Sequence, residues 1–184
     1  MKTKLIEQAI KYEGWQLSPH WIYKNFKIQG DSIVAFIGEC DVKLTEMVDI
    51  EDVINNEPIY SKSMLSFISE QFNVGLVEGV FRQRLLICVI KEALEKRGFK
   101  IYRDGDDLFF DNKKLTVSIA TKSVNSILIH TGINIDSNNA PVQASGLSSE
   151  LGIYDITDLA KEIMDKYSKE IDDIILASTK VRGV

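Results

Sequence analysis

The chain has 184 residues, of which 45% are hydrophobic and 27% charged, with a formal net charge of -5 at pH 7. Length and composition predict one globular domain over residues 1–184, with a substantial buried core. The acidic balance argues against broad nucleic-acid binding but leaves room for one small basic pocket, and no apolar run approaches the ~18 residues of a membrane helix.

The first half of the chain predicts one clear strand and two helices. Residues 1–30 are rich in aromatic residues and predict a loop with a short strand. Ser32–Cys40 is apolar and strand-forming, and Asp49 has the chemistry of a cap for a short helix that follows it. Ser61–Phe72 places its apolar residues at helical spacing, so we expect a helix there.

The second half predicts a long helix followed by a meander of strands. Phe81–Arg97 has the clearest helical pattern, and Gly98 is its natural stop. The turn Asp111-Asn112 favours a hairpin between the second and third of four predicted strands. These strands are Ile101-Tyr102, Leu108–Phe110, Thr116–Thr121 and Ser126–Ile135.

The chain ends in a polar loop, residues 136–149, and a helix over Thr157–Ala177. Helices, then a run of strands, then a closing helix indicate an α+β protein. We expect a mixed sheet with helices on one face.

The two cysteines fit neither a metal site nor a disulfide framework. Cys40 lies in the predicted strand and Cys88 in the long helix, and we interpret both as small buried apolar residues. The N-terminus lacks the pattern of a signal peptide, so we predict a cytoplasmic protein.

Lysines and carboxylates gather at one turn of the strand region. Lys113 and Lys114 are either solvated turn residues, or Lys114 points into a pocket and stabilises a carboxylate or phosphate. Asp104, Asp106 and Asp107 surround a glycine, as many turns require. The alternative is that one or two of them bind a ribose hydroxyl or a magnesium ion that carries phosphates.

The last predicted strand contains three further residues of interest. His130 is most simply a structural residue, because a lone histidine in an apolar strand is more typical of a core than of a catalyst. Gly132 weakens a strand interior and often marks the close approach of a ligand, with Asn134 two residues on. Nucleotide-binding glycine motifs, metalloprotease motifs and serine-hydrolase motifs are absent from the sequence, so function rests on this strand region.

This strand region resembles the biotin and lipoate protein ligase family. Arg103–Asp107 is similar to the family's Lys-Trp-Pro-Asn-Asp run, and Lys114-Leu115 falls where the family has its catalytic lysine. His130–Ile135 is similar to the family's Gly-Ile-Gly-Ile-Asn-Val, and Gly146–Gly152 to the short helix before its closing helix. Over its whole length the chain also resembles domain-of-unknown-function family 366.

The resemblance implies a class II synthetase-like fold with a mixed, mainly antiparallel sheet backed by helices. It implies that Lys114 is catalytic and contacts the carboxylate of a small acid and the phosphate of its adenylate. ATP with magnesium would be the cofactors, without a dedicated metal site, and an acceptor protein would be a further partner. The residues implied in cofactor binding are Arg103, Asp106, Asp107, Gly132 and Asn134.

The sequence also departs from the ligase pattern, and two other interpretations stay open. The family's glycine- and arginine-rich loop has no equivalent here, which favours a non-catalytic binding protein of the same fold. An ATP-independent acyltransferase is the third interpretation, with Cys40 as its nucleophile because strand ends are more accessible than helix cores. Sheet edges and the aromatic N-terminal segment are compatible with a homodimer.

Overall fold

A five-stranded mixed sheet forms the centre of the computed structural model, which describes residues 1–138 and 142–184. β1 pairs in parallel with β2, and every other pair in this sheet is antiparallel. In spatial order the strands are β1 (Lys2–Leu5), β2 (Ser32–Val42), β3 (Ile59–Phe72), β8 (Ser126–Asp136) and β7 (Thr116–Lys122).

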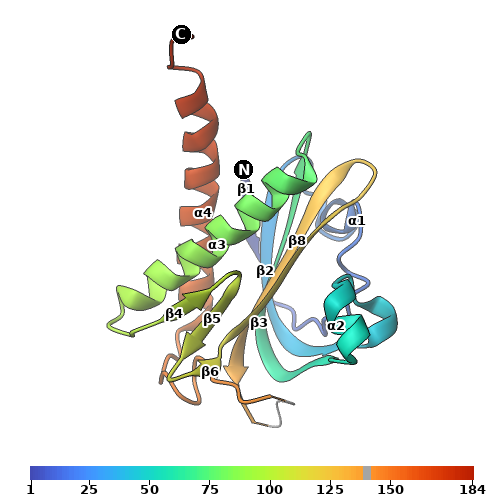
Figure 1. Cartoon of the computed structure of the whole chain (residues 1–184), viewed down its shortest axis with the longest axis vertical. Helices are drawn as coiled ribbons and strands as arrows, with labels where there is room; N and C mark the ends of the chain where they lie inside the picture. The colour runs from blue at the N-terminus through green and yellow to red at the C-terminus, as the bar shows by residue number, and fades with distance from the viewer. Residues whose placement is uncertain (139–141) are drawn as a thin grey trace.

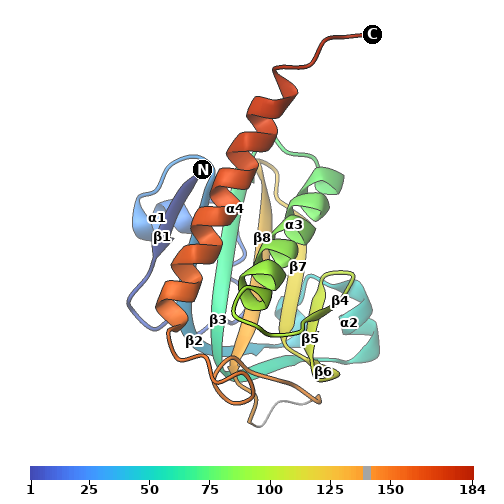
Figure 2. The ribbon, with the colours of Figure 1, turned by 90° about the vertical axis from the view of Figure 1, so that its left-hand side faces the viewer.

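Two long helices, α3 (Leu76–Glu95) and α4 (Ile156–Ser178), cover one face of this sheet (Figure 2). Apolar side chains of the strands and of both helices meet between the two layers and exclude water, which is the main source of stability in such a fold. Fully buried members of this core are Ile33, Phe67, Ile129, Leu86, Ile90 and Ile163.

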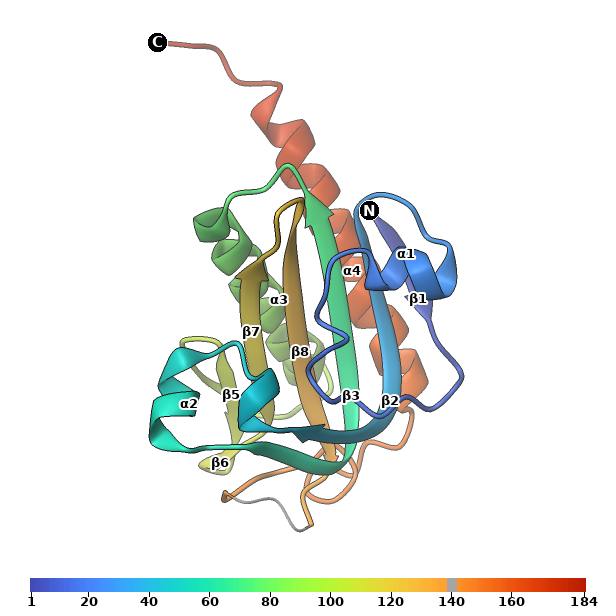
Figure 3. The same cartoon turned by 90° about the vertical axis from the view of Figure 1, so that its right-hand side faces the viewer.

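The N-terminal segment covers part of the opposite face and carries the short helix α1 (Trp21–Phe26) (Figure 3). A second, smaller core forms there, with Tyr12, Trp21, Phe36, Met64 and Ile68 among its buried members. The part of the sheet formed by β2 and β3 is therefore buried on both faces.

A separate three-stranded sheet lies beside α3, next to the main sheet (Figure 1). Its strands are β4 (Tyr102–Asp104), β5 (Asp107–Phe110) and β6 (Lys113–Lys114). Asp111 and Asn112 form the tight turn between β5 and β6, both in the left-handed conformation with φ of 50° and 60°. The turn sets the register Phe109↔Lys114.

The predicted helix over Ser61–Phe72 is wrong, because this segment is the long strand β3. β3 lies between β2 and β8 and is covered on both faces, with Met64 and Ile68 facing one core and Leu65 and Phe67 the other. A strand buried on both faces shows no polar–apolar alternation, so its apolar residues matched helical spacing by coincidence.

Most other predicted elements are confirmed, with shifted ends, but the helix α1 was missed within the predicted N-terminal loop, and two further predictions need correction. The short helix after Asp49 is α2 (Ile50–Asn55), preceded by the 3-10 turn η1 (Leu44–Glu46). The Asp111-Asn112 turn joins β5 to the two-residue β6 rather than to β7. Gly146–Gly152 forms hydrogen-bonded turns, with the amides of Glu150 and Leu151 donating to Gly146 O, in place of a short helix. The predicted loop 136–149 includes residues 139–141, which lie outside the described residues.

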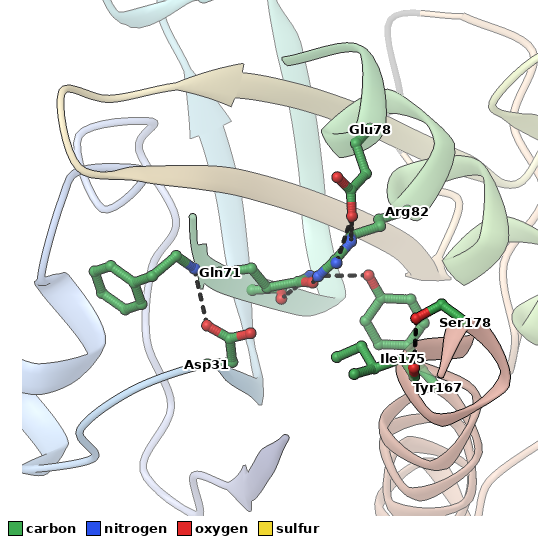
Figure 4. Close-up of polar contacts among 9 residues, drawn as sticks. Asp31, Gln71, Glu78, Arg82, Tyr167, Ile175 and Ser178 are labelled. Carbon is green, nitrogen blue, oxygen red and sulfur yellow. Dashed lines mark hydrogen bonds and ion pairs between the residues drawn. The ribbon is translucent and has the colours of Figure 1, made fainter. Parts of the chain in front are cut away.

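A polar network joins β3 to both long helices inside the helix-covered face (Figure 4). Gln71 Nε2 donates to the Tyr167 hydroxyl at 3.0 Å, and Arg82 donates to Gln71 Oε1 and, at 2.5 Å, to Glu78 Oε1. Satisfied buried polar groups of this kind specify one packing of the helices. Neither α3 nor α4, nor any shorter helix in the described part of the chain, is long and apolar enough to cross a membrane.

Candidate functional site

A cavity of about 320 Å³ lies on the sheet face opposite α3 and α4. Its floor comes from β3, β7 and β8, through Met64, Val117, Ile119, His130 and Asn134. Successive side chains of a strand point to opposite faces, so β8 sends Ile129 and Ile133 into the helix-side core and His130 and Asn134 to the cavity.

Lys114 and Asp107 lie together in the cavity wall. Lys114 Nζ is 2.9 Å from Asp107 Oδ2, and the two side chains are 36% and 32% exposed. Burial raises the pKa of the Asp107 carboxyl above its usual range, although its hydrogen bond and charge interaction with Lys114 act in the opposite direction. The predicted proximity of these two residues is confirmed.

The backbone around Lys114 is fixed on both sides, which gives the side chain a defined direction. Its amide donates to Gln143 O at 3.0 Å, and its carbonyl accepts from the Ser145 amide at 2.9 Å. The backbone carbonyl of the next residue, Leu115, accepts from the backbone N–H of Asn134 at 3.0 Å. Lys114 is therefore held between the small sheet and the segment after β8.

Asp106 lies in the cavity lining, whereas Arg103 lies outside it. Asp106 lines the cavity and is tied to α3, because Gln83 Nε2 and Arg84 donate to its carboxylate at 2.8 and 3.4 Å. Arg103 is exposed on β4, donates to Gly105 O at 2.6 Å, and is not among the cavity-lining residues. The structure thus brings Lys114, Asp106, Asp107 and Asn134 together but leaves Arg103 outside this group.

Gly132 faces the cavity side of β8 beneath the Met64 side chain. A Cβ placed on Gly132 would lie 2.2 Å from Met64 Sδ, so the close approach at this glycine is made by a side chain of β3. Met64 itself lines the cavity. Gly132 therefore shapes the cavity floor through Met64.

Asn134 is a nearly buried amide that lines the cavity. It is only 8% exposed, and its side chain makes no hydrogen bond to another residue in the described ranges 1–138 and 142–184. Its amide atoms are not fully buried, so they reach the solvent of the cavity and can pair there with water or with a polar atom of a ligand.

His130 is a structural part of the cavity floor. Its ring stacks on Tyr12 with 3.8 Å between centroids, and burial lowers the pKa of the imidazole from 6.5 to about 3. The ring is therefore neutral at pH 7 and too weakly basic to accept a proton there. This arrangement agrees with the structural interpretation of His130.

Neither cysteine has the surroundings of a nucleophile. Cys40 is fully buried, and burial raises the pKa of its thiol to about 12, so the expected accessibility at the strand end is wrong. Cys88 is half-buried on α3, which packs on the opposite face of the sheet. The acyltransferase interpretation therefore loses its nucleophile.

The sequence interpretation missed the acidic side chains that line the cavity from η1, α2 and the residues after them. Asp49 was identified only as a helix cap, and its side chain does accept from the Glu51 amide at 2.8 Å. The other acids of this segment that line the cavity are Glu46, Glu51, Asp52 and Glu57. The run of acids in residues 46–57 was the available signal.

Family membership follows from comparison with known sequences and structures. Residues 1–182 match the family described as "Domain of unknown function (DUF366)". The chain belongs to this family. An uncharacterized protein of Methanocaldococcus jannaschii, MJ0805, is 41% identical over 180 residues, which cover 95% of this chain and 81% of that protein.

Solved structures confirm the fold over nearly the whole DUF366 chain. A protein of unknown function from Pyrococcus horikoshi superposes with a TM-score of 0.93 at 38% identity, covering 100% of this chain and 98% of the other. A biotin protein ligase from Aquifex aeolicus, solved with biotin, gives a TM-score of 0.62 at 14% identity, covering 94% and 70%. A T. acidophilum protein described as a "putative lipoate protein ligase", solved with lipoic acid, and a lipoate-protein ligase A bound with ATP are similar as well, with TM-scores of 0.59 and 0.56 at 12% identity. The mixed, mainly antiparallel α+β fold of biotin and lipoate ligases is thereby confirmed, at identities that speak for the fold alone.

Proposed function

We propose that this protein binds a small carboxylic acid in the cavity and activates it with ATP as an acyl-adenylate. The observation that carries the proposal is Lys114, whose ammonium lies in the cavity wall on a strand of fixed register. A cavity of about 320 Å³ is of the size that holds a small molecule. Ligases of this fold have been solved with biotin, lipoic acid and ATP, which supports a small acid and a nucleotide as the ligands here.

In this reaction Lys114 exchanges its partner Asp107 for the carboxylate of the acid. A carboxylate oxygen attacks the α-phosphorus of ATP, an oxygen–phosphorus bond forms, and the bond from the α-phosphorus to the bridging oxygen breaks as pyrophosphate leaves. A compact ammonium beside the α-phosphate offsets the negative charge that gathers there. Lys114 is the residue for this role because it is the one lysine or arginine among the described residues that line the cavity.

Asp106 and Asp107 fit the magnesium ion that accompanies ATP. Both line the cavity, and carboxylate oxygens are ligands that Mg²⁺ prefers, with one or two of them and the substrate phosphates completing its shell. Bound there, the ion would neutralise phosphate charge. No group of three or more metal-ligating side chains is present among the described residues.

A binding protein without the chemistry is the second candidate function. It is favoured by the cavity lining, whose described residues include no arginine, and by Arg84, which contacts the lining residue Asp106 and is already paired with it. A triphosphate would therefore meet Lys114 without an arginine clamp.

Two measurements on wild type, Lys114→Ala and Lys113→Ala test the proposal. In a thermal-shift screen of small carboxylic acids with Mg·ATP, an acid at a hundred times its Kd should stabilise wild type by about 2.7 kcal/mol. Lys114→Ala should lose this stabilisation, whereas Lys113→Ala, on the neighbouring position of β6, should keep it. Acid-dependent exchange of pyrophosphate into ATP would then demonstrate adenylate formation.

The same measurements separate the two candidates. Binding of an acid that depends on Lys114, without pyrophosphate exchange, would support the binding protein. No stabilisation by any acid, with or without Mg·ATP, would contradict both.

A further inference from the structure

The charge of the cavity is far more acidic than a site for an anion needs. Its described lining carries seven carboxylates and a single ammonium, that of Lys114, which already has Asp107 as its partner at 2.9 Å. A cleft lined by one sign of charge concentrates ligand groups of the opposite sign. Five of these carboxylates form no ion pair with another described residue, and we call them the acidic wall: Glu46, Asp49, Glu51, Asp52 and Glu57.

Helix capping explains only part of the acidic wall. Asp49 caps α2, and carboxylates at Glu51 and Asp52 are favourable near a helix N-terminus. Glu46 precedes the helix and Glu57 follows it, so their position on the cavity has no such explanation.

Asp52 of the acidic wall lies within the electrostatic influence of the Lys114–Asp107 pair. Burial raises the pKa of the Asp52 carboxyl most, and Asp49 raises it further; Lys114 lowers it, and Glu57 and Asp107 raise it again. Figure 3 shows α2 in front of the main sheet, on the face opposite α3 and α4. Crowded like charges oppose folding, and such clusters are typical of sites where a ligand supplies the missing charge.

Neutral groups of the cavity also suit a nitrogen cation. Asn134 is 8% exposed as a whole residue, lines the cavity, and its side-chain oxygen has no hydrogen-bond partner among the described residues. Tyr60, which is 36% exposed, lines the same cavity, and an aromatic face attracts an ammonium group. Carboxylates, an amide oxygen and an aromatic ring together are the chemistry that recognises an amine.

We propose that the cavity takes a zwitterionic ligand, a small acid whose carboxylate pairs with Lys114 and whose ammonium group lies against the acidic wall and the Asn134 amide. The carboxylate end of this inference rests on the proposed function, and the ammonium end does not. The ligand's positive charge offsets carboxylates that the protein leaves unpaired.

Calorimetric titration with three probes of equal length tests this inference. Hexanoate carries only the carboxylate, hexylamine only the ammonium, and 6-aminohexanoate both. The titrations use EDTA and no ATP, so that magnesium cannot supply the positive charge. The proteins are wild type, Lys114→Met, Asp52→Asn and, as a matched control for a lost carboxylate, Asp173→Asn on the exposed side of α4.

The zwitterion should bind wild type about tenfold or more tightly than hexanoate, as a charge-assisted contact provides. Asp52→Asn should reduce this ratio at least threefold while leaving hexanoate binding equal or tighter, because one repelling charge has gone. Lys114→Met should remove the advantage of 6-aminohexanoate over hexylamine, and Asp173→Asn should bind all probes as wild type does.

The outcomes separate this inference from the proposed function. Equal, Lys114-dependent binding of hexanoate and 6-aminohexanoate would overturn the zwitterion and leave the proposed function intact. Binding of hexylamine alone, weakened in Asp52→Asn, would overturn the carboxylate end and with it the proposed function. Failure of all three probes to bind a protein with a native melting temperature would overturn the inference.

Discussion

The two faces of the central sheet are built from the same strands but differ in function. Towards α3 and α4, β8 presents Ile127, Ile129 and Ile133 to a closed apolar core. On the opposite face, the alternate residues of the same strand are Leu128, His130, Gly132 and Asn134, and part of that face stays open as the cavity. One face is packed for stability, and the other leaves polar groups for a ligand, so substitutions one residue apart should have separate effects.

The largest loss of stability should come from the helix-covered face. Ile129→Ala removes a fully buried side chain from the main core, and we expect the free energy of unfolding to fall by about 2–5 kcal/mol in urea denaturation. Ile119→Ala is the matched control on the cavity floor, where the side chain is half-buried, and should lose less than half as much. Equal losses would mean that the two faces do not differ in packing.

His130 should make the cavity face sensitive to acid. Burial lowers the pKa of its imidazole from 6.5 to about 3, so the folded state resists protonation that the unfolded state accepts. Stability should therefore be lost as the pH falls below 6.5, by about 1.4 kcal/mol per pH unit from this group. His130→Phe keeps a ring against Tyr12 and should reduce the fall in unfolding free energy between pH 7 and pH 5. Parallel pH profiles for the two proteins would contradict this.

A substitution at Gly132 should affect both the stability of the protein and ligand binding in the cavity. A Cβ there would lie 2.2 Å from Met64 Sδ, so Gly132→Ala should displace Met64 into the cavity and destabilise the protein by about 1–3 kcal/mol. Ligand binding should weaken with it. In a Met64→Ala background the same substitution should be nearly neutral for stability, as a double-mutant cycle measures.

Asn134 should show the smallest effect on stability and a clear effect on binding. Its side chain makes no hydrogen bond to a described residue, so Asn134→Ala should change the free energy of unfolding by less than about 0.5 kcal/mol. Affinity for 6-aminohexanoate should fall about tenfold, whereas Asn125→Ala, at an exposed turn, should leave it unchanged. A stability loss without a binding loss would make Asn134 a structural residue.

Local patterns in the sequence predicted the elements whose surroundings are themselves simple. The apolar residues of α3 and α4 recur at helical spacing, β7 and β8 are rich in strand-forming residues, and Asp111 and Asn112 suit a turn in the left-handed conformation. β3 was misassigned because covering both faces of a strand erases its alternation. The wrong prediction therefore follows from the central position of β3 in the sheet, between β2 and β8.

The candidate site was predictable only where its residues are neighbours in the chain. Lys114 and Asp107 meet across one hairpin, so the sequence contained their proximity. The acidic wall approaches them from residues 46–57, fifty or more positions away, and although the run of acids is visible in the sequence, the sequence does not indicate which side chains it faces. Arg103 is close to the site in sequence, yet the strand β4 keeps it outside the cavity lining.

The left-handed turn at Asp111 and Asn112 lines no part of the cavity, yet it selects which lysine the cavity receives. Side chains alternate along β6, so a slip of one residue in its pairing with β5 would turn Lys114 away and bring Lys113 to the cavity side. A residue that resists positive φ at the turn would favour such a slip. In evolution, substitutions at Asp111 and Asn112 would therefore change the site without altering any residue that lines it, because Lys113 would replace Lys114 at the cavity.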